Sequence, residues 1–206
     1  MRLIRPWLIF RFLYTDALFR IKTEDKILCL TFDDGPDPGS THEILSVLEK
    51  YGVKAVFFCS GRAAEKYSEL VTEIISRGHL IGNHGYDHPD GWKTSCKRYH
   101  EDIKKAAIFT SDTIIRPPYG HLRMNQYRCL RKTYKIVFWD IMPYDFDPRF
   151  DASRSFELLK KKIRPGSVIV LHDTPASYCI NYLEDFIKSS VSKGYRFEFS
   201  RFCFSD

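Results

Sequence analysis

The 206-residue sequence predicts an α/β fold with a parallel sheet in a single domain. Short apolar runs alternate with segments whose apolar residues recur at helical spacing, which is typical of β/α units. The runs are nearly continuously apolar, as in strands that a parallel sheet buries on both faces. About seven such units follow residue 26, so the sheet is expected to close into a barrel or to stay open with helices on both faces.

The elements can be justified in chain order. The run 26–32 is almost entirely apolar and stops at the turn Asp33-Asp34-Gly35-Pro36, so it predicts a buried strand. The next segment has a helical apolar stripe, with Ser40 or Thr41 as its cap and Gly52 as its stop. The same alternation predicts strands over 53–58, 79–83, 114–116, 135–139, 167–171 and 195–199, and helices over 68–77, about 98–110, about 153–163 and 180–192.

The composition indicates one core and no second domain. A hydrophobic content of 44% can bury a substantial core, and 206 residues leave little length for another. The six cysteines never form a C-x-x-C pair, so we expect reduced thiols and no zinc finger. The net charge of +6 includes no basic stripe with interleaved aromatic residues, which disfavours nucleic-acid binding.

Residues 1–25 precede the first strand and are basic and aromatic. Such a segment can rest weakly on an anionic membrane surface, but packing onto the barrel is the favoured interpretation. Arg11 interrupts the apolar run 6–10 after five residues, which is too short for the roughly 7–15 residues of a signal peptide. No stretch of about 20 apolar residues exists. By default we expect a cytoplasmic protein or one peripheral to the membrane.

Polar residues follow the first and third predicted strands directly, where barrel enzymes build their active sites. Asp33 and Asp34 are adjacent carboxylates that suit different roles, one facing a cation and the other a reacting water, although the same residues also favour a turn. His84 and His88 are four residues apart, so both rings could reach one ion from a helical turn. With one carboxylate they would supply the three ligands of a catalytic metal site.

Three further strand ends carry unusual polar groups. Arg116, in Arg116-Pro117-Pro118-Tyr119, closes a strand that the prolines must end, and its guanidinium could hold a carboxylate ionised. Asp140 and Asp145 follow the strand that ends at Trp139, and His172 follows an apolar strand at Leu171. Each feature alone could be ordinary, but their joint occurrence at successive strand ends is not expected by chance.

Taken together, the motifs resemble those of the polysaccharide deacetylases (NodB homology), carbohydrate esterase family 4, which includes chitin and peptidoglycan deacetylases. The resemblance covers about residues 26–200 and implies a distorted (β/α)7 barrel, with a catalytic domain over 26–206. It rests on five motifs: Thr31-Phe32-Asp33-Asp34-Gly35, His84-x-x-x-His88, Arg116-Pro117-Pro118-Tyr119, Asp145-Phe146 and Leu171-His172.

This resemblance implies a metal-dependent hydrolase that removes acetyl groups from N-acetylated sugars of a polysaccharide or oligosaccharide. Asp33 would be the catalytic base, and Asp34, His84 and His88 would hold one divalent ion. Zinc is the first expectation, with cobalt, nickel or manganese as alternatives.

The same resemblance assigns four supporting positions. Arg116 would orient the catalytic base, and the Tyr119 backbone N–H would contribute to the oxyanion hole. His172 would be the general acid, tuned by Asp145.

Three other functions compete with this interpretation. Two histidines and a carboxylate also form the facial triad of non-haem iron oxygenases, but β/α alternation disagrees with an antiparallel scaffold. An inactive sugar-binding module on the same barrel would have lost a catalytic residue, whereas every position is filled here. The third is a deacylase of a small, non-polymeric amide. The sequence leaves the polymer and the oligomeric state open.

Overall fold

The computed structural model describes residues 4–6 and 8–199, and its centre is a curled sheet of seven parallel strands, as predicted. The strand order is β5-β4-β3-β2-β1-β6, and β7 pairs with β1 as well. The strands are β1 (Ile27–Asp34), β2 (Val56–Cys59), β3 (Leu80–Asn83), β4 (Ile114–Ile115), β5 (Lys135–Ile136), β6 (Ser167–His172) and β7 (Arg196–Phe197).

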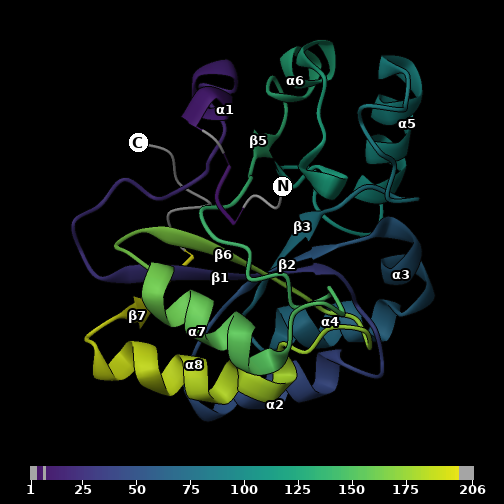
Figure 1. The fold of residues 1–206 in the computed structure, drawn as a ribbon. Helices are drawn as coiled ribbons and strands as arrows, with labels where there is room; N and C mark the ends of the chain where they lie inside the picture. The colour runs from purple at the N-terminus through teal and green to yellow at the C-terminus, as the bar shows by residue number, and fades with distance from the viewer. Residues whose placement is uncertain (1–3, 7, 200–206) are drawn as a thin grey trace.

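Helices cover the sheet on both sides (Figure 1). In that view α2, α4, α7 and α8 lie below the sheet and α1, α5 and α6 lie above it. The helices are α1 (Leu8–Leu13), α2 (Thr41–Lys50), α3 (Gly61–Lys66), α4 (Ser68–Ser76), α5 (Cys96–Ala107), α6 (Met124–Leu130), α7 (Ala152–Lys162) and α8 (Ile180–Ser192), with a 3-10 turn, η1, at Pro118–Gly120. Within the described residues, no helix has both the length and the apolar character needed to cross a membrane.

Strand β1 is the centre of the sheet and fixes where polar side chains meet. Seven of its eight residues are buried, as its apolar sequence predicts. In the parallel register Asp33 pairs with Phe58 of β2 on one side and with His172 of β6 on the other. Cys59 of β2 pairs in turn with Asn83 of β3. The carboxyl ends of β1, β2, β3 and β6 therefore lie at one edge of the sheet.

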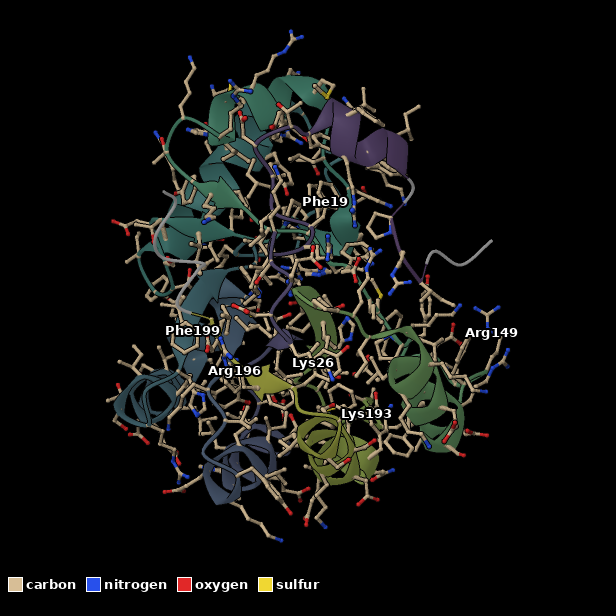
Figure 2. All side chains as sticks on the ribbon, turned by 90° about the vertical axis from the view of Figure 1, so that its left-hand side faces the viewer. Phe19, Lys26, Arg149, Lys193, Arg196 and Phe199 are labelled. Carbon is tan, nitrogen blue, oxygen red and sulfur yellow. The ribbon has the colours of Figure 1, made fainter. Side chains whose placement is uncertain are left out.

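The opposite end of the strands is closed by β7. Arg196 pairs with Ile27 at the start of β1, and the Lys26 ammonium donates to the Lys193 carbonyl at 2.8 Å. Figure 2 shows Lys26, Lys193 and Arg196 together at this end of the molecule. The basic residues around β7 are thus remote from the carboxyl edge of the sheet.

Three short helices, α1, α3 and α6, were not expected from the sequence. Helix α3 has only six residues, which is too short to show an apolar period. Its cap did give a signal, because the Ser60 hydroxyl accepts from the Ala63 N–H at 3.3 Å. The strand predicted over 135–139 is also wrong in length, because regular pairing ends at Ile136.

The N-terminal segment explains why β5 is short. Leu18 N–H donates to the Ile136 carbonyl and Phe138 N–H donates to the Leu18 carbonyl, both at 2.8 Å. Ile21 N–H donates to the Gly166 carbonyl at 2.9 Å on the β6 side. Residues 18–21 therefore lie in the seam between β5 and β6, where a sequence pattern assigns no partner. Phe19 is buried there, between α1 and the barrel (Figure 2).

Asp140 holds this segment to the barrel. Its carboxylate is fully buried and accepts from Arg11 Nη2 at 3.2 Å, Arg164 Nε at 3.1 Å and Ser167 Oγ at 2.8 Å. Burial alone would raise the pKa of Asp140, but the hydrogen bonds from Arg164 and Ser167 and the charges of Arg5 and Arg164 lower it. Asp140, considered above as a strand-end polar group, therefore has a structural role, and Arg5 and Arg11 face a carboxylate instead of a lipid surface.

Replacing Asp140 by Ala is expected to destabilise the fold by about 3–5 kcal/mol, the scale for removing one partner of a buried ion pair. The mutation leaves the guanidinium groups of Arg11 and Arg164 without their carboxylate. Urea denaturation followed by circular dichroism measures the effect. Asp185→Ala is the control, since its side chain is 69% exposed and its Lys188 contact is 3.9 Å. Equal midpoints for the two variants would contradict this role.

Candidate active site

Asp33 and Asp34 end β1 with their carboxylates in different surroundings. Asp33 is 5% exposed and extended, whereas Asp34 has φ of 78°, a left-handed conformation that few non-glycine residues adopt. The next residue must be small, because a Cβ on Gly35 would lie 2.3 Å from an Asp173 carboxylate oxygen. The two adjacent carboxylates therefore start from different backbone conformations and lie in different surroundings.

Asp34, His84 and His88 form a set of three ligand atoms. Asp34 Oδ1 is 3.5 Å from His84 Nε2 and 3.3 Å from His88 Nε2, and all three atoms lie within 4.8 Å of one another. His84 Nδ1 is 2.8 Å from the Arg116 carbonyl, so Nδ1–H donates there and Nε2 keeps a lone pair for an ion. Burial, with the neighbouring His88, lowers the pKa of His84 to about 3. The neutral imidazole of His84, a second imidazole and one carboxylate are the ligand types that suit a divalent ion.

The two histidines do not lie on a helical turn, contrary to the sequence interpretation. Residues 84–88 form a loop in which Gly85 has φ of 74° and His88 φ of 53°. Asn83 Oδ1 accepts from Gly85 N–H at 2.9 Å, and Asp102 Oδ1 accepts from Tyr86 N–H at 2.7 Å. The i, i+4 spacing was therefore informative, but hydrogen bonds from the loop backbone to Asn83 and Asp102 hold the loop in shape. No sequence signal pointed to Asp102.

Arg116 fixes the Asp33 carboxylate. The guanidinium is 1% exposed; its Nη1 donates to Asp33 Oδ1 at 2.6 Å and to Thr31 Oγ1 at 2.7 Å. Its Nη2 donates to the Phe138 carbonyl at 3.0 Å, next to the N-terminal seam. Asp33 Oδ2 remains on the side of the histidines, 3.8 Å from His84 Nε2. One oxygen of Asp33 is thus occupied by the arginine and the other faces the ligand set.

His172 and Asp145 form a second pair, in which the carboxylate is fully buried and the imidazole is 12% exposed. His172 Nδ1 lies 2.9 Å from Asp145 Oδ1, and the His172 backbone N–H donates to Oδ2 at 2.8 Å. Ser177 Oγ also donates to Oδ2, at 2.6 Å. Burial disfavours the charged ring, but the Asp145 charge and hydrogen bond outweigh it and raise the pKa of His172 to about 9. The imidazole is therefore protonated at neutral pH.

Tyr119 lies beside the ligand set on the turn η1. Its backbone has φ of 58°, and its ring, 59% exposed, contacts the His88 ring edge to face at 4.5 Å. The following Gly120 is also left-handed, and a Cβ there would lie 2.5 Å from Trp139. The turn after the two prolines is thus packed tightly against the cavity wall.

One cavity of about 490 Å³ joins these groups. Asp145 does not line it but lies behind His172, where it holds the ring. Seven of the eight predicted site residues do line it: Asp33, Asp34, His84, His88, Arg116, Tyr119 and His172.

Asp173 is a supporting residue that the sequence analysis did not assign. It is fully buried and accepts from Ser40 Oγ at 2.6 Å and Thr41 Oγ1 at 2.7 Å at the start of α2. Its backbone N–H donates to the Asp33 carbonyl at 2.8 Å. Burial raises the pKa of Asp173 to about 6 against the effect of the two hydroxyls. Its position next to His172 was the available signal.

A sequence profile of the polysaccharide deacetylases matches residues 20–134, more than half of the chain. The chain belongs to the polysaccharide deacetylase family. A peptidoglycan-N-acetylglucosamine deacetylase of Bacillus cereus is 35% identical over 180 residues, which cover 82% of this chain and 65% of that protein. A chitooligosaccharide deacetylase of Rhizobium leguminosarum bv. trifolii is 31% identical over 162 residues, 73% of each chain.

The fold of this polysaccharide deacetylase family member has a solved counterpart. The Bc1960 peptidoglycan N-acetylglucosamine deacetylase, solved in complex with 4-naphthalen-1-yl-N-oxidanyl-benzamide, superposes with a TM-score of 0.88 at 32% identity. The match covers 96% of this chain and 97% of the other. The predicted distorted (β/α)7 barrel is thereby confirmed, and the match includes most of the N-terminal segment.

Proposed function

We propose that this chain is a metal-dependent hydrolase that removes acetyl groups from N-acetylated sugars of a peptidoglycan- or chitin-like glycan. The observation that carries the proposal is that two charged pairs, Asp33–Arg116 and His172–Asp145, meet at one three-ligand set. The names of the relatives support the substrate class, since they act on peptidoglycan N-acetylglucosamine and on chitooligosaccharides.

Asp34, His84 and His88 would hold the divalent ion, with zinc the first candidate because imidazole and carboxylate are among its preferred ligands. When bound, such an ion lowers the pKa of a water molecule to about 7 and polarises a carbonyl group. The hydrogen bond from His84 Nδ1 to the Arg116 carbonyl keeps the ring oriented toward that ion.

Asp33 would accept the proton of the attacking water. Its Oδ1 is held by Arg116, so Oδ2 is the oxygen available on the side of the ligand set. The guanidinium also fixes the orientation of this carboxylate, as a base that must face the attacking water requires. The Tyr119 backbone N–H would donate to the oxygen that becomes negative when the amide carbonyl is attacked.

His172 would protonate the leaving amine. Because Nδ1 donates to Asp145, the second proton of the imidazolium is on Nε2, available to the cavity. The C–N bond of the acetamide breaks, the sugar nitrogen takes this proton, and acetate leaves with the oxygen of water. Phe146, whose ring contacts the His172 ring at 4.5 Å, limits the water around the acid.

The alternatives fit this geometry less well. An oxygenase could use Asp34, His84 and His88 as its triad, but it has no use for the two charged pairs beside it. A sugar-binding module would need no buried Arg116–Asp33 contact at the ligand set.

Acetate release tests the function. Chitooligosaccharides, peptidoglycan and small N-acetyl sugars are offered to the purified protein with and without a chelator. We expect release from the glycans that the chelator stops and added divalent ion restores. Release from small amides alone would favour the non-polymeric deacylase, and no release from any substrate would contradict the proposal.

His88→Ala is expected to reduce bound metal from about one ion per chain to a small fraction, because two ligands cannot complete the set. Elemental analysis of the purified proteins measures the content. His42→Ala is the matched control, since His42 lies on α2 with its side chain 56% exposed and pairs with Glu73. Equal metal content in wild type and His88→Ala would show that the ligand set is wrong.

A further inference from the structure

A row of aromatic rings leads away from the ligand set along the cavity wall. The Tyr119 ring contacts the ligand His88 at 4.5 Å and lies 5.9 Å from the His121 ring. His121 in turn stacks on Trp92 at 3.5 Å, with only 8° between the ring planes. All four side chains line the same cavity. The Trp92–His121 stack is therefore continuous with the proposed active site.

The stack is fixed at its polar edge by one carboxylate. Asp90 Oδ1 accepts from the Trp92 backbone N–H at 2.9 Å and lies 3.0 Å from His121 Nδ1. The two stacked residues come from segments about thirty positions apart, so a single side chain ties both loops together.

The buried side-chain amide of Gln126 also fixes the loop that carries Trp92. Gln126 is 1% exposed, and its Nε2 donates to the Gly91 carbonyl at 2.9 Å and to the Thr94 carbonyl at 3.1 Å. Gly91 lies so close to the second segment that a Cβ would be 2.1 Å from the His121 carbonyl oxygen. Neither loop can move without breaking these contacts, so the stack is preorganised.

This rigid support holds rings that remain in water. Trp92 is 48% exposed and Tyr119 is 59% exposed, and neither belongs to the three apolar clusters that form the described core. Apolar surface left in water costs free energy, and a grouped patch at the wall of a cavity marks a binding site more often than a scattered residue does. The support is therefore better explained by a ligand than by folding.

We propose that the Trp92–His121 stack binds a second sugar ring of the glycan while the N-acetyl sugar to be deacetylated lies at Asp33 and Asp34. A pyranose with equatorial substituents presents a flat face of weakly positive C–H bonds, which an aromatic face attracts. This assignment rests on the proposed function and makes it more specific. The substrate is a glycan of at least two units, and Trp92 selects for chain length.

Binding at a remote sugar can be used to position the reacting one, so it raises kcat/KM for longer chains. The experiment compares kcat/KM for N-acetylglucosamine and for its β-1,4-linked trisaccharide. Trp92→Ala is expected to lower the ratio of trisaccharide to monosaccharide about tenfold, the loss of roughly one stacking contact. Trp92→Phe is expected to keep most of that ratio. Ile75→Ala on α4, 55% exposed and outside the cavity, is the control that leaves it unchanged.

Direct binding separates this inference from the proposed reaction. Calorimetric titration of the Asp33→Asn variant measures the affinity for the trisaccharide without deacetylating it. Tighter binding of the trisaccharide than of the monosaccharide, lost with Trp92→Ala and kept with Trp92→Phe, supports the stack even if no acetate is ever released. Equal binding of both sugars by the parent protein, or equal trisaccharide binding with and without Trp92, overturns it.

Discussion

Asp33→Asn is expected to lower acetate release by about 100-fold or more while the protein keeps its fold and its metal. General-base contributions are typically of this size, and an amide cannot take a proton from water. The amide that replaces the carboxylate would still offer an oxygen to Arg116, which now donates to Asp33 Oδ1 at 2.6 Å. Initial rates on a glycan that the wild type clearly turns over measure the loss.

Two controls make this result specific to proton transfer. Metal content should equal that of wild type, because the ligand set consists of Asp34, His84 and His88. Asp185→Asn, on the exposed face of α8, should leave the rate unchanged. A rate for Asp33→Asn within a few-fold of wild type would refute the assigned base even with the metal site correct.

The strand ends could be predicted because two local signals coincide there. A continuously apolar run identifies β1, and Asp33-Asp34 ends it, so the register of a parallel sheet then brings Asp33 beside His172 of β6. The helices α2 and α8 were equally predictable, since their apolar stripes and stops are local as well. The positions of the candidate site residues thus followed from sequence order.

Other features depend on contacts between distant segments. The place of residues 18–21 in the seam could not be predicted from local pattern, because their backbone partners include the distant residues Ile136 and Gly166. Asp140 looked like a polar group at a strand end, yet Arg11 and Arg164 bury it away from the cavity. Which carboxylate faces the cavity is a question of side-chain direction, which residue spacing alone does not determine.

Backbone conformation was the other hidden feature. Asp34, His88 and Tyr119 all have positive φ, although none is glycine. Such conformations are costly and persist where surrounding contacts impose them, often at functional sites. The motif spacing of four between the histidines suggested a helical turn, but the loop achieves the same convergence with different torsion angles. Here the meeting of these residues at one cavity was predictable from their places at strand ends, and the backbone conformation of the loops was not.

His172→Ala is expected to lower acetate release by about 100-fold or more, because the leaving amine loses its proton donor.

The structure also predicts how the activity of the wild type depends on pH. Asp145 raises the pKa of His172 to about 9 despite burial, so the acid form is present below that pH and lost above it. For wild type, kcat/KM should therefore fall on the alkaline side near pH 9. Fold stability depends on pH in the same direction. The contribution of the His172–Asp145 pair to the free energy of unfolding is complete below about pH 6.5 and disappears as the pH rises through 9.

Asp145→Asn tests the cause of that shift. Without the carboxylate charge, burial dominates and the pKa of His172 should fall, so the alkaline limb of kcat/KM should move to lower pH. Ser177→Ala removes one hydrogen-bond donor to Asp145 Oδ2 and leaves the carboxylate charge. The alkaline limb of kcat/KM for this variant should therefore stay close to that of wild type. Metal content, measured alongside, should be the same in all three proteins. An alkaline limb that stays near pH 9 in Asp145→Asn would mean that a group other than His172 controls it, and the assignment of the general acid would then be wrong.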